Sequence, residues 1–421
     1  MVRTLRKAGI GGLGVLLTWM LFSLIAMAFL GRAEASEAWR LERVVVVMRH
    51  GVRPPTKARV VPEGFTQKTW PSWDVDWGFL TGHGAQAVTK LGALDARSYG
   101  AFLGEDCHNL RVVADIDQRT LKTAEAYAQA LDPKCPVTVE HGPMDQADPR
   151  FSPFEADTPA DGEAMLAAAQ GALGPGGLAA VDAHYAPLLK KLDAILGCCS
   201  APACPDGAAS CGLEDMPTRF VDKENRVKID GGLDTASSLA QVLLLQYADA
   251  KPLDSVGWGQ ADRQTIADLS ALHALEFQLV ARPKAIADFG ARPLLAEVKR
   301  GLFATDTKKM TVLVGHDSNL AYIGGALDLH WKAGGLAPDS LAPDSLAKDD
   351  PAPGGALIFE KWRNAQGREV VIVRYRAQSL DQMRNLTDLT PDASHILPLS
   401  LCHSKTACAA KRFETLLDSV K

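Results

Sequence analysis

The chain has 421 residues, enough for one large core or two smaller ones, and its 47% hydrophobic and 23% charged content is typical of a globular protein. A formal net charge of -5 offers nucleic acid no general attraction, so we expect no nucleic-acid partner. A local basic cluster at residues 49–57 is therefore more informative than the total charge.

The N-terminus has the pattern of a secretory signal. "MVRTLRK" carries three basic residues, an uncharged run covers residues 8–31, and the small-x-small tripeptide AEA at 33–35 precedes Ser36. This predicts a signal peptide over residues 1–35 and a periplasmic or secreted protein that makes no membrane contact after cleavage. The uncharged run is also long enough to cross a bilayer, so an uncleaved membrane anchor is the alternative.

Two apolar runs in the first 150 residues predict strands. "RVVVVM" at 43–48 is continuous, as expected for a strand buried on both faces. "LRVVADID" at 110–117 is the second, and it precedes residues 118–131, in which Leu and Ala recur at helical spacing. From about 160 to 300 the chain is rich in Ala and Leu, with little strand signal, which predicts helices.

The C-terminal part returns to strands. "MTVLVG" at 310–315 precedes a helix that Asp317 or Ser318 can cap, and the runs 354–362 and 368–378 flank an Asn-Ala-Gln-Gly turn typical of a hairpin. The sequence therefore predicts an α/β fold with a mixed central sheet flanked by helices. We expect a discontinuous α/β domain over 36–160 and 300–421, interrupted by a mainly α-helical insertion at 161–299 that covers the active-site cleft.

Unusual polar residues follow each of the three buried strands. In α/β sheets ligands bind beyond the carboxyl ends of the strands, so we expect these residues to share one crevice if the strands are neighbours. Guanidinium forks match phosphate oxygens, and a helix that begins after His316 adds backbone donors, so the crevice suits a phosphoryl group. The residues are Arg49, His50 and Arg53 after the first strand, Asp115, Asp117 and Arg119 after the second, and His316 and Asp317 after the third.

Phosphoryl transfer without a metal requires positive charge from side chains, a nucleophile and an acid for the leaving group. His50 can be the nucleophile, and Asp317 can be the proton donor if its surroundings keep it protonated. Ordinary explanations exist for each part: a structural histidine, an ion pair between Arg119 and Asp115 or Asp117, and a helix cap at 316–317. All three occurring together at three strand ends favours the functional interpretation.

The motifs resemble those of a known family. "RHGVRPPTK" resembles the R-H-G-x-R-x-P signature of the histidine acid phosphatases, "DIDQRT" their D-x-x-R-T motif, and "GHDSNLA" their distal H-D motif. Further similarity to the bacterial periplasmic branch, the phytases and glucose-1-phosphatases, runs from about residue 40 to 410. The resemblance implies a phosphoglycerate-mutase-like α/β domain with an inserted α domain, no metal or organic cofactor, and a small organic phosphate such as phytate or a sugar phosphate as substrate.

The resemblance also assigns roles residue by residue. His50 would be the phosphorylated nucleophile and Asp317 the proton donor. The phosphate would be held by Arg49, Arg53, Arg119 and His316, with Thr56 helping.

Two positions bear on the choice of substrate. Lys57 suits a multiply charged substrate. Gln241 stands where the similar phytases carry a glutamate, which changes the contacts offered to an inositol phosphate or a sugar hydroxyl. We expect His273, on an apolar helix face, to pack in the interior or line the cleft.

All eight cysteines are expected in disulfides, because an even count in local groups behind a signal peptide is typical of an oxidising compartment. The resemblance implies Cys107–Cys135, Cys402–Cys408 and a local bridge within residues 198–211. That four-cysteine group lacks the C-x2-C spacing of zinc sites, so two disulfides are favoured over a metal site. Because adjacent cysteines do not easily bond each other, we expect Cys198 and Cys199 to reach Cys204 and Cys211, one each.

Two rival functions remain at this point. A non-catalytic phosphate- or inositol-phosphate-binding protein would be expected to have lost His50 or Asp317, and neither is lost. A phosphoglycerate-mutase-like phosphotransferase shares RHG, but the proline-rich "RHGVRPP" and the aspartate after His316 argue against it. The sequence does not give the oligomeric state, for which we favour a monomer.

Overall fold

The structure is a computed structural model that describes residues 38–58, 61–155, 160–223, 226–305, 308–332 and 346–420. The predicted signal peptide over residues 1–35 lies outside the described residues. Leu41–Trp362 and Glu369–Lys421 form one compact unit, to which all that follows refers. The turn Arg363–Arg368 is assigned to a second unit, in which the Asn364 amide donates to the Arg368 carbonyl at 3.0 Å.

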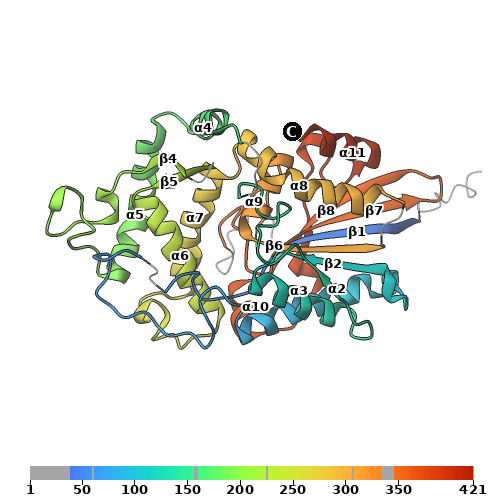
Figure 1. Ribbon diagram of the computed structural model, residues 1–421, viewed down its shortest axis with the longest axis horizontal. Coiled ribbons are helices and arrows are strands. Elements are labelled where there is room, and N and C mark those ends of the chain that lie inside the picture. Colours follow the sequence, from blue (N-terminus) through green and yellow to red (C-terminus); the bar gives the residue numbers. More distant parts are fainter. Residues whose placement is uncertain are drawn as a thin grey trace, which may run out of the picture. The chain divides into compact units, whose positions relative to one another are not determined.

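The compact unit contains a mixed sheet with helices on both of its sides (Figure 1). Its strand order is β10-β8-β7-β1-β6-β2-β3, and β9 pairs with β8. The strands β1, β6, β2 and β3 are parallel, whereas β9 and β10 run antiparallel to β8. The strands are β1 (Trp39–Arg49), β2 (Leu110–Ala114), β3 (Val139–Glu140), β6 (Met310–Gly315), β7 (Ala356–Asn364), β8 (Glu369–Arg376), β9 (Ser394–Ile396) and β10 (Cys408–Ala409).

Helices cover both faces of this sheet, as the alternation of side chains along β1 requires. Val44, Val46 and Met48 belong to the core cluster that contains side chains of α2 and α3, and Val45 and Val47 belong to the cluster that contains α8, α9 and α11. All five are fully buried, which explains the continuous apolar run in the sequence. The helices are α2 (Gly82–Leu103), α3 (Gln118–Leu131), α8 (Lys284–Phe303), α9 (Asp317–Leu327), α10 (Leu380–Asn385) and α11 (Ala410–Ser419).

The segment between β3 and β6 is mainly helical, but it also contains a hairpin that we did not predict from the sequence. The hairpin pairs β4 (Arg219–Lys223) with β5 (Arg226–Asp230) in antiparallel register. The expected end of the insertion at residue 299 falls inside α8. The division of the compact unit into an α/β domain and a helical insertion stays a prediction. The helices of the segment are α4 (Gly162–Gly171), α5 (Gly177–Leu196), α6 (Gly232–Ala248) and α7 (Arg263–Val280). Among the described helices, none has the length and apolar character needed to cross a membrane.

The disulfides confirm two expectations and correct a third. Cys107–Cys135 and Cys402–Cys408 are bonded as expected. In the four-cysteine group, however, Cys198 bonds Cys199, and Cys204 bonds Cys211. The prediction that the two adjacent cysteines reach separate partners is wrong. The backbone of Cys199 does lie against Cys211 through amide–carbonyl hydrogen bonds of 2.8 and 3.2 Å, but the Cys211 sulfur bonds Cys204, whose Cα is 5.6 Å away.

The three predicted buried strands are neighbours and end at the same level. Arg49 of β1 pairs with Gly315 of β6, and Ala114 of β2 pairs with Val314 of β6. The residues that follow these ends are therefore brought together at one edge of the sheet.

Candidate active site

His50 follows the central strand β1 and is 1% exposed. Its backbone is fixed on both sides: its amide donates to the Gly315 carbonyl and its carbonyl accepts from the Gly354 amide, both at 2.9 Å. A Cβ atom on Gly51 would lie 2.8 Å from Val88 of α2 and 2.9 Å from Leu80 in the loop that precedes α2. A larger residue at position 51 would therefore have to displace both of these side chains.

The hydrogen bonds of the His50 ring determine which nitrogen is free. Nδ1 lies 2.8 Å from the Gly51 carbonyl oxygen, which can only accept, so Nδ1 carries the proton and Nε2 keeps its lone pair. Burial, followed by the charges of Arg53, Arg119, Arg49 and His316, lowers the pKa of His50 well below its usual value. The ring therefore stays neutral at acidic pH, and Nε2 keeps its lone pair.

Arg49 lies behind His50 and is completely buried. Its Nη1 donates to the Pro351 carbonyl at 2.5 Å, and its Nη2 lies 2.5 Å from Gln241 Oε1 and 2.8 Å from Asp317 Oδ2. Gln241 comes from α6, so this guanidinium connects the sheet edge to the helical segment. The Gln241 Nε2 is buried and has no hydrogen-bond partner among the described residues.

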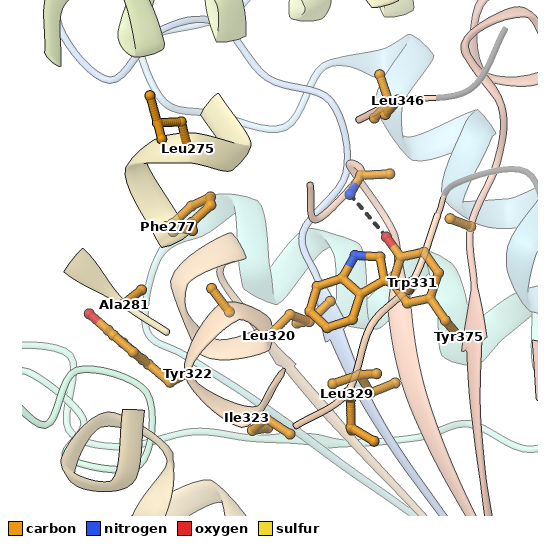
Figure 2. Packing of buried hydrophobic residues seen from close by; sticks show 14 of the residues in the cluster. Leu275, Phe277, Ala281, Leu320, Tyr322, Ile323, Leu329, Trp331, Leu346 and Tyr375 are labelled. Atoms are coloured by element: carbon orange, nitrogen blue, oxygen red, sulfur yellow. Dashed lines mark hydrogen bonds between the residues drawn. The ribbon is translucent and has the colours of Figure 1, made fainter. Parts of the chain in front are cut away.

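The residues on either side of Pro351, whose carbonyl accepts a hydrogen bond from Arg49, are held by the aromatic side chains of Trp331 and Tyr375. The Ala352 amide donates to the Tyr375 hydroxyl at 3.1 Å, and the Trp331 indole stacks on the Tyr375 ring at 5.2 Å between centroids (Figure 2). The Trp331 indole N–H also donates to the Asp350 carbonyl at 3.1 Å. These contacts fix Pro351, which accepts a hydrogen bond from Arg49, and Asp350, whose carboxylate contacts His273.

Two further arginines face His50. Arg53 follows in the same loop, and Arg119 stands in the first turn of α3, where its Nη2 lies 2.8 Å from Asp117 Oδ2. Burial, together with the neighbouring arginines, lowers the pKa of Arg53 to about 9, so it keeps its charge at acidic and neutral pH. The Nε atoms of Arg49, Arg53 and Arg119 are buried donors without a partner in the described part of the chain. Unsatisfied donors of this kind suit an anion with several acceptor oxygens.

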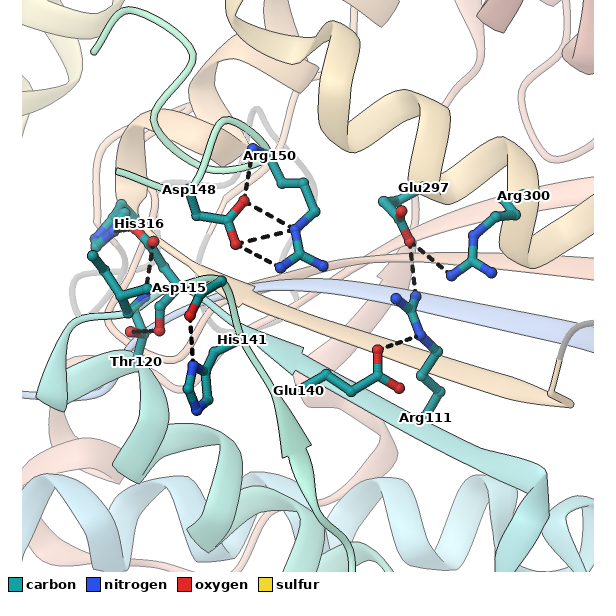
Figure 3. Close-up of polar contacts among 12 residues, drawn as sticks. Arg111, Asp115, Thr120, Glu140, His141, Asp148, Arg150, Glu297, Arg300 and His316 are labelled. Atoms are coloured by element: carbon teal, nitrogen blue, oxygen red, sulfur yellow. Dashed lines mark hydrogen bonds and ion pairs between the residues drawn. The ribbon is translucent and has the colours of Figure 1, made fainter. Parts of the chain in front are cut away.

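His316 and Asp115 bring the other two strand ends together (Figure 3). His316 Nε2 lies 2.6 Å from Asp115 Oδ2, and the His316 and His50 rings are edge to face with centroids 5.7 Å apart. Asn319 clamps the start of α9, because its Oδ1 accepts from the His316 amide and its Nδ2 donates to the Phe151 carbonyl, both at 2.8 Å. His316 is thus the N-cap residue of α9, not Asp317 or Ser318.

Asp317 is the first residue of α9, and its Oδ1 accepts from the Ser318 amide at 2.9 Å. Burial alone would raise its pKa, but the positive charges around it, chiefly those of Arg49 and His273 and also that of Arg53, outweigh burial and hold the pKa well below its usual range. Without a ligand the carboxyl group is therefore ionised.

The predicted site residues line two cavities that share Arg53 and Asp317. One, of about 410 Å³, also contains His50, Arg119 and His316. The other, of about 350 Å³, contains Thr56, Lys57 and Gln241. Arg49 lies behind them rather than in their walls. Every predicted binding residue is thus at or next to these cavities, and His273 lines the second one, as expected.

Several wall residues have no signal in the sequence. They come from the loop at 151–155, the hairpin β4–β5, α6, α7 and the second turn of α9, and only the folded chain brings them here. They are Phe151, Ser152, Pro153, Phe154, Glu155, Arg226 and Tyr322 in the first cavity, and Ser237 and Glu276 in the second. Asp350, which pairs with buried His273 at 2.6 Å, was also missed.

Two groups of side chains have metal-ligand spacing in the described part of the chain, and one of them lies in this site. Asp115, Asp117 and His316 offer one ligand atom each within 4.8 Å of one another. In the structure Asp115 is paired with His316, and Asp117 with Arg119. The guanidinium beside this group favours an anion over a cation, so the arrangement gives no support to a metal centre.

Comparison with known proteins gives the family. A model of the histidine phosphatase superfamily (branch 2) matches residues 40–167. The chain is 31% identical over 422 residues to phytase AppA of Escherichia coli (strain K12), with 92% of this chain and 94% of that protein covered. The chain belongs to the histidine phosphatase superfamily.

Two other similarities agree with this membership. A glucose-1-phosphatase of Providencia rettgeri is 29% identical, with 86% of this chain and 87% of that protein covered. The solved structure of the Hafnia alvei phytase in complex with myo-inositol hexakis sulphate is 29% identical, with a TM-score of 0.79 over 90% of this chain and 96% of that chain. The mixed sheet flanked by helices is thus the fold of a histidine phosphatase.

Proposed function

We propose that the protein is an exported acid phosphatase that hydrolyses phosphate monoesters through a phosphohistidine at His50. The observation that carries the proposal is the state of the His50 ring. Its Nδ1 proton is bound by the Gly51 carbonyl, so the lone pair of Nε2 is available in a cavity walled by Arg53, Arg119 and His316. A neutral, fixed imidazole among positive charges suits attack on a phosphorus atom.

In the first step Nε2 attacks phosphorus while the bond to the ester oxygen breaks. The electron pair of that bond goes to the leaving oxygen, which takes a proton from Asp317. The negative charge on the transferred phosphoryl oxygens is stabilised by Arg49, Arg53 and Arg119, whose Nε donors have no other partner among the described residues. The start of α9 at His316 adds backbone donors and the positive end of a helix dipole.

In the second step a water molecule attacks the phosphohistidine, and the N–P bond breaks. Asp317, now a carboxylate, takes a proton from that water, and Nε2 recovers its lone pair. The Asp115 carboxylate lies 2.6 Å from His316 Nε2 and so holds this ring in the wall of the cavity.

The second cavity is proposed to hold the alcohol part of the substrate. Lys57 and Thr56 stand on its exposed side, and Gln241 gives it an amide donor because its oxygen is already used by Arg49. These groups suit a polyol that carries oxygens or further phosphates, so phytate and sugar phosphates are the proposed substrates. The named activities of the similar proteins, phytase and glucose-1-phosphatase, support the same choice.

The test is phosphate release at mildly acidic pH from phytate, glucose 1-phosphate and an aryl phosphate, with EDTA present. We expect turnover by the wild type and its loss in His50→Ala. His184→Ala is the matched control, because His184 is an exposed histidine on α5, outside both cavities. Quenching with alkali during turnover should trap an acid-labile phosphoenzyme that His50→Ala lacks. No release by the wild type from any of the three substrates would contradict the proposal.

A further inference from the structure

A buried histidine–aspartate pair, to which the proposed mechanism gives no role, lies at the second cavity. His273 of α7 lines this cavity of about 350 Å³ together with Asp317. Its Nδ1 lies 2.6 Å from Asp350 Oδ1, and both side chains are buried. A carboxylate only accepts hydrogen bonds, so Nδ1 carries a proton and Nε2 is the ring nitrogen left to face the cavity.

The fold fixes both members of the pair. The Asp350 amide donates to the Ala347 carbonyl at 3.2 Å, and the Asp350 carbonyl accepts from the Trp331 indole N–H at 3.1 Å. The Phe277 ring, one turn further along α7, is edge to face with the His273 ring, with centroids 4.8 Å apart. The contact between His273 and Asp350 is therefore in place before a substrate binds.

Asp350 keeps a positive charge on His273 in spite of burial. Burial alone would lower the pKa of His273, but the charge and the hydrogen bond of Asp350, followed by the charge of Asp317, outweigh it and raise the pKa above its usual value, although the charge of Arg49 opposes them. At mildly acidic pH the ring is therefore an imidazolium, with a proton on Nε2 as well as on Nδ1.

The other charged groups around His273 are engaged elsewhere or lie across the cavity. Asp317 is paired with Arg49, and Glu276 accepts from the Ser237 hydroxyl, whereas Asp350 contacts the ring itself. The charged groups that act on His273 or share its cavity are Asp350 before β7, Asp317 of α9, Arg49 of β1, Arg53 and Lys57 of the loop after β1, and Glu276 of α7.

Asp317 needs a proton before it can act as an acid. Against burial, its pKa is held low first by Arg49 and next by His273, so the carboxyl group is ionised in the free protein. An arginine does not release its proton in this pH range, but an imidazolium does. Because His273 and Asp317 line the same cavity, the imidazolium is a neighbouring source of the proton that the carboxylate lacks.

We propose that His273, held and kept charged by Asp350, supplies the proton that Asp317 gives to the leaving oxygen. In the first step the Nε2 proton passes to the Asp317 carboxylate and from there to the leaving oxygen as the P–O bond breaks, and His273 becomes neutral. In the second step Asp317 takes a proton from the attacking water and returns it to Nε2. The pair neither gains nor loses a proton over the whole cycle.

In this role His273 and Asp350 are positioning residues, because they act through Asp317 and not on the reacting atoms. The inference rests on the proposed phosphatase function and deepens it. It predicts that the pH range in which an alkyl phosphate is hydrolysed depends on the charge of Asp350.

Asp350→Asn tests the proposal, because asparagine keeps an oxygen that can accept from Nδ1 but removes the charge. We would measure the ratio of kcat for glucose 1-phosphate to kcat for an aryl phosphate across the acidic and neutral range. Only the alkyl leaving group needs a proton, so the ratio falls as the pH rises through the pKa of the coupled acid. Loss of the neighbouring negative charge lowers that pKa, so in the variant the fall should occur about one to three pH units lower.

Asp349→Asn is the matched control. Asp349 Oδ2 contacts His330 Nδ1 at the same distance of 2.6 Å, but neither residue lines the two cavities. The same substitution at the adjacent position should therefore leave the fall of the ratio at the wild-type pH.

Two outcomes in Asp350→Asn would overturn the inference. One is a ratio that falls at the same pH as in the wild type. The other is a ratio lowered equally at every pH, which would show that Asp350 only supports the structure. His273→Gln removes the proton carrier, so it should lower the ratio about tenfold or more even at acidic pH, and a wild-type ratio in this variant would contradict the proposal as well.

An NMR titration of the His273 ring separates this result from the phosphatase function, because it requires no turnover. The signal is identified by its absence in His273→Gln, and it should titrate about one to three pH units lower in Asp350→Asn than in the wild type. Equal titration in the two proteins would overturn the inference even in an active enzyme. If the wild type released phosphate from none of the substrates, the proposed function would fail, and the titration would still show whether Asp350 keeps the charge on His273.

Discussion

His395 should make the protein less stable in acid, by an amount that the structure allows us to work out. It lies in β9 with its ring edge to face with Tyr375, and both ring nitrogens are buried without a partner in the described part of the chain. Burial, and secondarily the charge of Arg374, lowers the pKa of His395 to about 4, against 6.5 when it is exposed. The unfolded chain therefore binds a proton as the pH falls below 6.5, while the folded chain stays neutral until about pH 4.

Because the unfolded state binds more protons in this window, stability is lost as the pH falls through it. At pH 5 the unfolded imidazole is almost fully protonated and the folded one is mostly neutral, so the loss is about 2 kcal/mol, and at pH 7.5 it is close to zero. Replacing His395 by Phe removes this pH-dependent term. Relative to the wild type, His395→Phe should therefore gain about 2 kcal/mol of unfolding free energy on going from pH 7.5 to pH 5.

The assay is urea unfolding of both proteins at the two pH values. Any constant change in packing caused by the substitution cancels, because only the difference between pH values is compared. His184→Phe provides the control, since that histidine is exposed on α5. If the variant and the wild type lost the same free energy between pH 7.5 and pH 5, the buried neutral state of His395 would be wrong.

Three further predictions concern catalysis, packing and covalent stability. Asp317→Asn should slow an alkyl phosphate such as glucose 1-phosphate by a factor of about 10² to 10⁴ and an aryl phosphate far less, because only the alkoxide needs a proton on leaving; equal losses in kcat would contradict its role as acid. Gly290→Ala should cost about 1–3 kcal/mol in urea unfolding because its Cβ would meet an aromatic ring at 2.5 Å, whereas Gly100→Ala on α2, with nothing within 4 Å, should be neutral or stabilising. Replacing Cys107 and Cys135 by Ser should cost about 3–4 kcal/mol of unfolding free energy, as expected for opening a 28-residue loop. A dithiol should then lower the unfolding midpoint of the variant by less than it lowers that of the wild type.

The part of the site that lies on the sheet was predictable because its signals are local. Continuous apolar runs locate β1, β2 and β6, and the general rule that ligands bind beyond strand ends locates the crevice. The remaining condition was that these strands be neighbours, and the registers of β1 with β6 and of β2 with β6 meet it. His50, Arg119 and Asp317 could thus be found without the structure.

The part contributed by the inserted segment was harder to predict, because the local sequence does not say which residues face the site. "RVKID" at 226–230 alternates charged and apolar residues, as β5 requires, so the strand had a signal in the sequence, but the direction of Arg226 had none. The contact between Asp350 and His273 joins residues 77 positions apart and has no local pattern. The pairing of Cys198 with Cys199 likewise depends on where the Cys211 sulfur points, which the spacing of the cysteines does not determine.

In the proposed mechanism, the ionised state of Asp317 allows one carboxyl group to serve both chemical steps. In the absence of substrate its pKa is held low against burial chiefly by Arg49, which lies 2.8 Å away. A bound phosphate brings negative charge to Arg49 and Arg53, offsets the charges that favour the carboxylate, and so raises the pKa of Asp317 only in the complex. The acid would therefore form when a leaving oxygen is present to take its proton. The carboxylate that remains after this transfer would still be paired with Arg49, and it is then the base that the attacking water requires.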